Sequence, residues 1–206
     1  MDIVLTGTGS PIPDPNRAGP STLVKVGELE HILIDAGRGV VMRMAGAGSI
    51  PPLLSGVLVT HLHSDHLTDL NDVITTHWVM SPGPRELKIV GPPGIARFVE
   101  LTLAALEPDM GYRIAHHDDL DYRPAVAVTE VEPGDAFELG SASVSVFETI
   151  HAPVHPTVGF QVCSVHSMRL IVVMSSLLRP WRVRQADLTF EQCPSPLPGS
   201  RNPLAV

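Results

Sequence analysis

The sequence THLHSDHLTDL, residues 60–70, gathers three histidines and two aspartates in one short stretch. It follows the apolar run SGVLVT (55–60), which predicts a β-strand, and it leads into a pattern typical of a helix. Side chains two apart on an extended chain point the same way, so His61 and His63 can converge on one ion. Asp65 and His66 follow where the chain turns, and adjacent side chains there point in different directions. The stretch therefore predicts a metal site with up to two ions.

The donor types indicate which metal and which chemistry to expect. Imidazole and carboxylate ligands without thiolate suit Zn²⁺, with Mn²⁺ or Fe²⁺ as alternatives. Two cations a few Å apart can activate a water between them and hold the oxygen that develops charge. A single histidine at a strand end is usually an ordinary polar residue, whereas His-x-His-x-Asp-His after an apolar strand is a specific pattern. We therefore expect a hydrolytic metal centre.

The rest of the chain predicts an α/β fold. Short β-branched runs bounded by Gly, Pro or Asp predict strands at 2–6, 21–26, 31–35, 55–60, 87–91, 125–130, 143–149 and 157–162. Helical patterns cover 38–45, 64–79 and 94–106. The segment PIPDPNRAGP (11–20) is too rich in proline and glycine for either element and predicts an ordered loop.

Several motifs together resemble the metallo-β-lactamase superfamily, and within it the ribonuclease Z-like and arylsulfatase-like branch. Besides HLHSDH, they are LTGTGSPIPDPNRAGPSTLV, LIDAGRGV, GPPG, GYRIAHHDDL and HAPVHPTVGFQV, and they cover roughly residues 1–162. The resemblance implies an αββα sandwich with metals at one edge of the sheets. It also implies that His61, His63 and a later histidine hold one zinc, while Asp65 and His66 serve a second. Asp65 would also be the catalytic proton acceptor.

The later histidine matches His151, at the end of the alternating run SVSVFETIH (143–151). His155 is a competitor four residues further on, and the position directly after the strand favours His151. The resemblance also assigns Asp35, in LIDAG, to the support of the site, with an ordinary strand-ending turn aspartate as the alternative.

Two further features have weaker interpretations. His116 and His117 either face the substrate or lie on the surface. Gly7 and Gly9 in GTGS do not form a nucleotide-binding loop, because the prolines that follow exclude the helix that such a loop would open.

The resemblance ends after Val162. The family continues into a strand ending in Gly-Asp-Thr, whose aspartate bridges the metals, and a further histidine follows. Here MRLIVVM (168–174) predicts a strand but leads into SSLLRPWRVRQ, so the bridging aspartate and the last histidine have no matching positions. We therefore expect a metallo-β-lactamase-like domain over 1–162, with its second half incomplete. A divergent tail over 163–206 would hold one strand and then irregular chain.

Composition changes at the same point. Residues 1–162 hold 9 basic and 20 acidic residues, and residues 163–206 hold 5 and 2. The end, CPSPLPGSRNPLAV (193–206), is typical of a segment that does not pack. One hypothesis is a truncated or frame-shifted member of the family; the other is a divergent subfamily with a short C-terminus. Reading the coding DNA downstream of Val162 in all three frames distinguishes them.

The formal net charge of −8 argues against indiscriminate binding to nucleic acid or anionic membrane. No run is long and apolar enough for a membrane span, and two cysteines are too few for a secreted disulfide scaffold. Because the start also lacks a signal peptide pattern, the cytoplasm is the expected location. Exposed strand edges would favour a homo-oligomer.

Three functions from different classes follow. The first is zinc-dependent hydrolysis of a small-molecule ester or phosphodiester, with tRNA as a further candidate substrate, through a zinc-bound hydroxide. The second is a metal-binding remnant with impaired catalysis, because the bridging aspartate has no match. The third is a non-enzymatic partner of a full-length relative.

Overall fold

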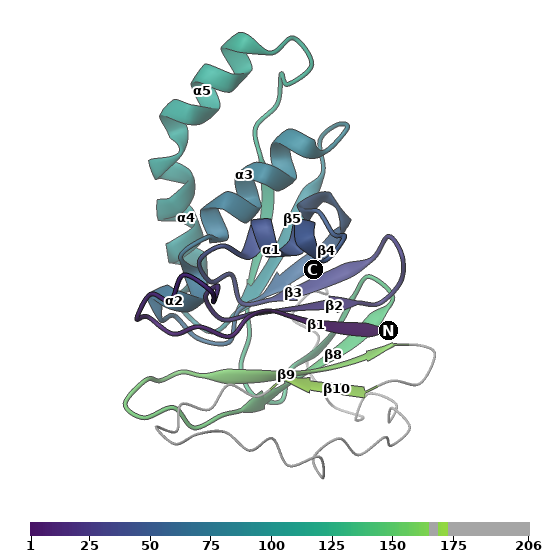
Figure 1. The fold of residues 1–206 in the computed structure, drawn as a ribbon, viewed down its shortest axis with the longest axis vertical. Coiled ribbons are helices and arrows are strands. Elements are labelled where there is room, and N and C mark those ends of the chain that lie inside the picture. The colour runs from purple at the N-terminus through teal and green to yellow at the C-terminus, as the bar shows by residue number, and fades with distance from the viewer. Residues whose placement is uncertain (165–168, 173–206) are drawn as a thin grey trace.

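The computed structural model describes residues 1–164 and 169–172, which form two β-sheets and a layer of helices (Figure 1). The first sheet has the order β1-β2-β3-β4-β5-β6. Its strands are β1 (Asp2–Gly7), β2 (Ser21–Lys25), β3 (His31–Ile34), β4 (Leu54–Leu58), β5 (Glu86–Gly91) and β6 (Ala125–Glu130). The pairs from β1 to β3 are antiparallel, and the pairs from β3 to β6 are parallel.

The second sheet has the order β10-β9-β8-β7 and is antiparallel throughout. Its strands are β7 (Ala136–Leu139), β8 (Ala142–Glu148), β9 (Val158–Ser164) and β10 (Arg169–Val172). β9 passes the expected domain boundary at residue 162, and β10 lies within the strand expected at 168–174. Residues 173–206 of the expected tail lie outside the described residues.

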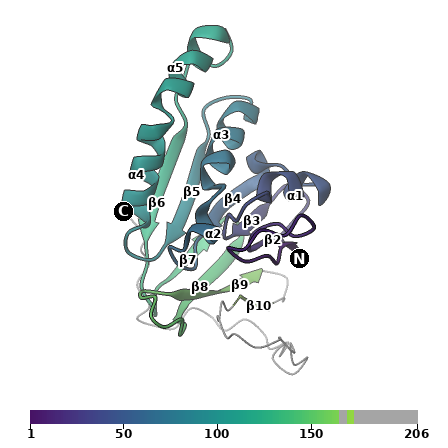
Figure 2. The ribbon, with the colours of Figure 1, turned by 60° about the vertical axis from the view of Figure 1, so that its left-hand side comes forward.

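The helices lie in the crossover connections that join the parallel strands β3 to β6. They are α1 (Val40–Gly46), the 3₁₀ turn η1 (Pro51–Leu53), α2 (Ser64–Leu67), α3 (Leu70–Met80), α4 (Ile95–Ala105) and α5 (Glu107–His116). Figure 2 shows α1, α3 and α4 on one face of the six-stranded sheet, with the second sheet on the other side. α4 packs against β6, and α5 continues from it away from the sheets as an arm. No helix among the described residues has the length and apolarity to cross a bilayer.

Alternation along the central strands divides the core into two layers. On β2 and β3, Leu23 and Leu33 pack against the helices, while Val24 and Ile32 pack against the second sheet. Phe160, fully buried on β9, belongs to the layer between the sheets. The two-sided burial explains why these strands read as continuous apolar runs.

Besides the short 3₁₀ turn η1, the structure adds two elements that the sequence patterns did not predict. α5 has one buried residue, Met110, which packs with the half-buried Ile114, and this apolar stripe is short for a helical pattern. β7 is four residues long and pairs with β8. The helix expected over 64–79 is instead two helices, because Asp69 leaves helical geometry and accepts a hydrogen bond from the Gly39 N–H.

Candidate metal centre

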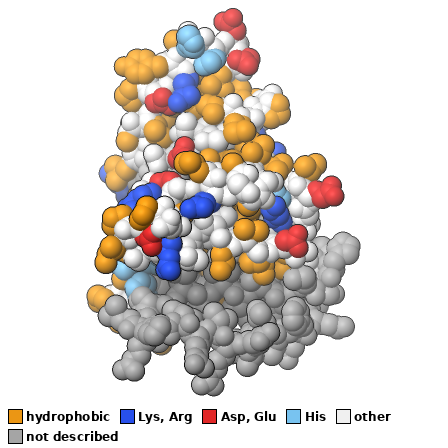
Figure 3. All heavy atoms as spheres, viewed as in Figure 1, with side chains coloured by type: hydrophobic (Ala, Val, Ile, Leu, Met, Phe, Trp, Pro, Cys, Tyr) orange, Lys and Arg blue, Asp and Glu red, His pale blue; other side chains and the backbone are white. Residues whose placement is uncertain are grey.

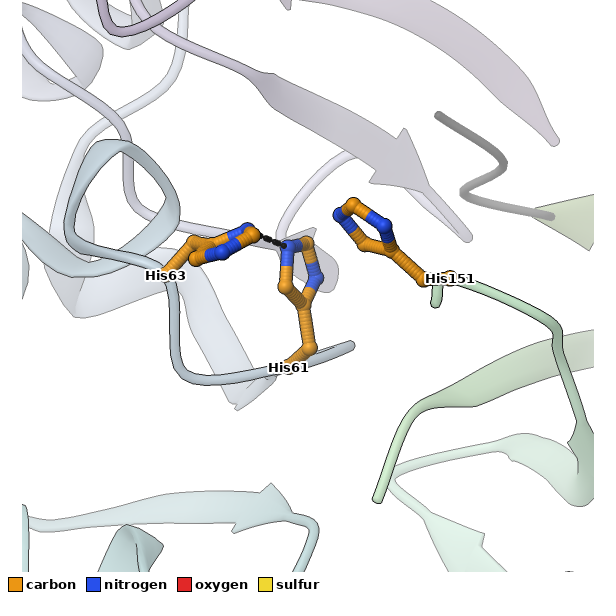
Figure 4. A group of neighbouring side chains, drawn as sticks. All are labelled: His61, His63 and His151. Atoms are coloured by element: carbon orange, nitrogen blue, oxygen red, sulfur yellow. Dashed lines mark hydrogen bonds between the residues drawn. The ribbon is translucent and has the colours of Figure 1, made fainter. Parts of the chain in front are cut away.

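His61, His63 and His151 converge at one edge of the two sheets (Figure 4). His61 and His63 lie in the segment after β4, and His151 lies in the connection between β8 and β9. One ligand atom from each lies within 4.8 Å of the others. His61 Nε2 is 3.0 Å from His63 Nδ1. Two strands that are far apart in sequence therefore bring three imidazoles to one point.

The backbone of Thr60 joins the two sheets beside this group. Its carbonyl accepts a hydrogen bond of 2.9 Å from the Val158 N–H at the start of β9. Across the same connection, Thr157 Oγ1 donates to the Thr149 carbonyl over 2.6 Å. These bonds hold the segment that carries His151 against the end of β4.

The three rings have different electrostatic environments. Burial, together with the neighbouring His66, His151 and His63, lowers the pKa of His61 to about 3. Burial also lowers the pKa of His151, with His63 and His66 adding to the shift and Asp65 opposing it. At neutral pH, His61 and His151 are therefore uncharged, the state in which an imidazole nitrogen can hold a metal.

Asp35 is buried next to the histidine trio, where it contacts Thr60 and His66. Its Oδ1 accepts hydrogen bonds from the Thr60 backbone N–H at 2.9 Å and from Thr60 Oγ1 at 3.1 Å. Its Oδ2 lies 2.9 Å from Thr60 Oγ1 and 2.8 Å from His66 Nδ1. Asp35 has a φ of 59°, a left-handed conformation that aspartate tolerates better than most residues. The turn after β3 thus directs its carboxylate toward Thr60 and His66.

Asp65 and His66 lie in α2 and are both buried. His66 Nε2 is 3.7 Å from Asp65 Oδ2, and the His66 ring centroid is 4.1 Å from that of His61. Burial alone would lower the pKa of His66, but the hydrogen bond to Asp35 and the charges of Asp35 and Asp65 raise it above its ordinary value. Asp65 and His66 are thus adjacent to the histidine trio but outside it, on the side of His61.

The remaining histidines named from the sequence lie elsewhere. His155 is exposed and is not a member of the trio, whereas His151 has ring contacts with both His61 and His63. His116 and His117 are exposed at the end of α5, with ring centroids 4.8 Å apart. Figure 3 shows histidine and acidic side chains gathered at the end of the arm.

Thr60 is the residue of this site that the sequence patterns missed. Its side chain is fully buried and lies 2.9 Å from His61 Nδ1. The signal available in the sequence was a hydroxyl residue directly before the first histidine, at the end of a buried strand.

The trio has the donor set of a cation site, and one pair of its ligand atoms has a fitting separation. Ligands about 2.0–2.1 Å from a tetrahedral zinc ion lie roughly 3.4 Å from each other, and the 3.0 Å between His61 Nε2 and His63 Nδ1 is close to this value. Among the described residues, these three form the one group of histidine, cysteine or acidic side chains that could hold a metal ion. A site with three protein ligands leaves a position open for water or substrate.

Comparison with known families gives one match and a consistent set of relatives. The family model described as Anti-Pycsar protein Apyc1 matches residues 1–178. The chain is 52% identical over 164 residues to a Ribonuclease Z from Mycolicibacterium paratuberculosis and 53% identical to one from Mycobacterium avium. Each match covers 79% of this chain and 58% of the relative. The chain therefore spans less than two thirds of the length of the curated relatives it matches.

Solved structures with a similar fold include human tRNase Z, short form. Its TM-score is 0.65, with 22% identity over 84% of this chain and 68% of that one. The metallo-beta-lactamase fold protein YhfI from Bacillus subtilis has a TM-score of 0.61 and 19% identity, over 82% of this chain and 59% of that one. These identities are low, and the likeness shows the fold. The expected metallo-β-lactamase fold is confirmed.

Proposed function

Because the chain belongs to the Anti-Pycsar protein Apyc1 family and to the ribonuclease Z-like part of the metallo-β-lactamase superfamily, we propose that it is a metal-dependent phosphodiester hydrolase. The observation that carries this proposal is the trio of His61, His63 and His151, whose ligand atoms lie within 4.8 Å of one another. The trio combines residues from both sheets, so the fold itself brings the ligands together.

The donor set favours zinc, with Mn²⁺ or Fe²⁺ as alternatives. His61, His63 and His151 would hold the first cation, and Asp65 and His66 would contribute to a second. When bound, such a cation acidifies a water molecule and polarises a phosphoryl oxygen. Asp65, buried beside His66, would be the proton acceptor. Asp35 holds His66 in place through the 2.8 Å hydrogen bond.

The substrate class rests on the names of relatives and on charge. Matched relatives are named Ribonuclease Z, which supports tRNA as one candidate. The acidic balance of the chain favours a smaller phosphodiester, because phosphate backbones are bound by basic surfaces. Figure 3 shows acidic, basic and apolar side chains interspersed on the viewed face. An aryl sulfate or another ester remains the alternative small substrate.

The first experiment measures metal content per chain by mass spectrometry after purification without chelators. The same preparations are assayed with a chromogenic phosphodiester. His61→Ala and His151→Ala should lose the cation and reduce turnover more than about 100-fold, beyond the usual cost of changing a ligand's hydrogen-bond partner. His155→Ala is the matched control, because this histidine is exposed and near the same loop. Retention of metal and activity in His61→Ala would overturn the proposal.

A second candidate is a metal-binding protein with little turnover. It is favoured because the described residues contain one cluster of three ligands. Asp65→Ala separates the two candidates. Two cations in the wild type and one in Asp65→Ala would support the active enzyme. One cation in both, with no measurable hydrolysis, would support the second candidate.

A further inference from the structure

Thr60 is fully buried, and each of its polar atoms has a partner. Its N–H donates to Asp35 Oδ1 at 2.9 Å, and its carbonyl accepts from the Val158 N–H at 2.9 Å. Its hydroxyl oxygen lies 2.9 Å from Asp35 Oδ2 and also 2.9 Å from His61 Nδ1. The hydroxyl therefore stands between a carboxylate and a ring nitrogen of the trio.

The number of hydrogens fixes the direction of these bonds. A hydroxyl has one hydrogen to donate and two lone pairs, whereas an ionised carboxylate only accepts. If Thr60 donated to His61 Nδ1, its lone pairs would face the Asp35 oxygens at 2.9 and 3.1 Å with no hydrogen between them. The hydroxyl hydrogen must therefore point to Asp35.

The same count then determines the protonation of His61. Because the Thr60 hydroxyl donates to Asp35, its oxygen accepts from His61, and the ring hydrogen must be on Nδ1. A neutral imidazole has one N–H, so Nε2 keeps its lone pair. That nitrogen is the one that faces His63 Nδ1 at 3.0 Å (Figure 4).

We propose that Thr60 is a positioning residue that holds His61 in the Nδ1–H tautomer and so presents the Nε2 lone pair to the metal position. This inference rests on the proposed function, because it assigns a role toward the cation that the trio would hold. It extends the support of the site from Asp35 to a second residue: Asp35 contacts His66 directly and reaches His61 only through the Thr60 hydroxyl. A single carboxylate thereby orients two neighbouring histidines, His66 directly and His61 through Thr60.

The test compares three substitutions of buried threonines. Thr60→Val removes the hydroxyl and keeps the shape, while Thr60→Ser keeps the hydroxyl. Thr149→Val is the matched control, because Thr149 is buried near the same sheet edge and its Oγ1 has no hydrogen-bond partner among the described residues. Long-range ¹H–¹⁵N correlation spectra of the chelator-treated protein identify which ring nitrogen of His61 carries hydrogen. A zinc titration then gives the affinity.

The wild type, Thr60→Ser and Thr149→Val should show His61 with hydrogen on Nδ1. Thr60→Val should lose this preference and bind zinc about 10–100-fold more weakly, the usual effect of changing a ligand's hydrogen-bond partner. An Nδ1–H tautomer with unchanged affinity in Thr60→Val would overturn the inference, as would an Nε2–H tautomer in the wild type.

The two proposals can fail separately. A wild-type protein that binds no zinc but shows the Thr60-dependent tautomer would contradict the proposed function and support the tautomer assignment. If the wild type binds zinc and hydrolyses the substrate, but Thr60→Val changes neither the tautomer nor the zinc affinity, the proposed function would be supported and the tautomer assignment contradicted.

Discussion

Asp35 Oδ2 lies 2.8 Å from His66 Nδ1, and both side chains are almost completely removed from solvent. The partners come from the turn after β3 and from α2, thirty-one positions apart in the sequence. This bond attaches His66, at the end of the HLHSDH motif, to the turn after the central strand β3. Thr60 attaches the first half to the same carboxylate.

We expect Asp35→Asn to destabilise the metal-free protein by about 3 kcal/mol, because an amide cannot accept all the hydrogen bonds of the buried carboxylate. Urea denaturation at pH 7 measures the free energy of unfolding. Asp72→Asn is the control: this residue is exposed on α3, and among the described residues it bonds only to Thr76 of the same helix. An equal loss in both variants would contradict the assignment of Asp35 as the central acceptor.

The buried His77 should make the stability of the fold sensitive to acid. This residue of α3 is buried, and its Nε2 has no hydrogen-bond partner within the described part of the chain. Burial, with a smaller contribution from Arg85, lowers the pKa of His77 from 6.5 to about 4. Below pH 6.5 the unfolded chain therefore takes up a proton that the folded state does not. The stability that neutral His77 allows is present above pH 6.5 and is lost as the pH falls toward 4.

The loss should reach about 3 kcal/mol near pH 4, since each pKa unit corresponds to about 1.4 kcal/mol. His77→Gln should make the free energy of unfolding less dependent on pH between 7 and 5, even if the variant is less stable at pH 7. Denaturant titrations at both pH values, compared with exposed His155→Gln, measure this difference. If the free energy of unfolding depends on pH in the same way in the wild type and in His77→Gln, His77 does not cause the acid sensitivity.

Gly37 should not accept even a methyl group. A Cβ there would lie 2.4 Å from the Gly19 carbonyl carbon and 2.6 Å from the Asp65 carbonyl oxygen, and both are backbone atoms. Gly37→Ala should lower the free energy of unfolding by about 3 kcal/mol or more, because the backbone near the metal centre would have to move. Gly83→Ala, with open space around its Cβ, is the thermal denaturation control. Equal melting temperatures for the two variants would show that the loops adapt.

Thr149→Val should increase stability. The Thr149 hydroxyl is buried without a hydrogen-bond partner in residues 1–164 or 169–172, so replacing it with a methyl group removes a desolvation cost of about 1 kcal/mol. Chemical denaturation measures the gain. A loss of stability would indicate that the hydroxyl has a bridging water.

Local patterns predicted much of this fold. Each strand expected between residues 2 and 162 is present. Burial of one or both faces of a strand requires alternating or continuous apolar residues, and this pattern can be read from the sequence. The family resemblance indicated His151, and its position after an alternating strand favoured it over His155. The role of Thr60 could not be predicted, since it depends on Asp35, twenty-five positions away, and on hydrogen-bond direction. α5 was missed because Met110 is its one buried residue and its apolar stripe is short.

The hydrogen bond from Val158 to the Thr60 carbonyl has a consequence for folding. Since His61 and His63 follow β4 and His151 follows β8, the trio exists only when the two sheets are docked in register. A cation that binds all three must favour the docked state by the free energy of its binding. Metal affinity and sheet association are then two measurements of one equilibrium, and a variant that loosens the interface far from the histidines should lower the affinity for the ion.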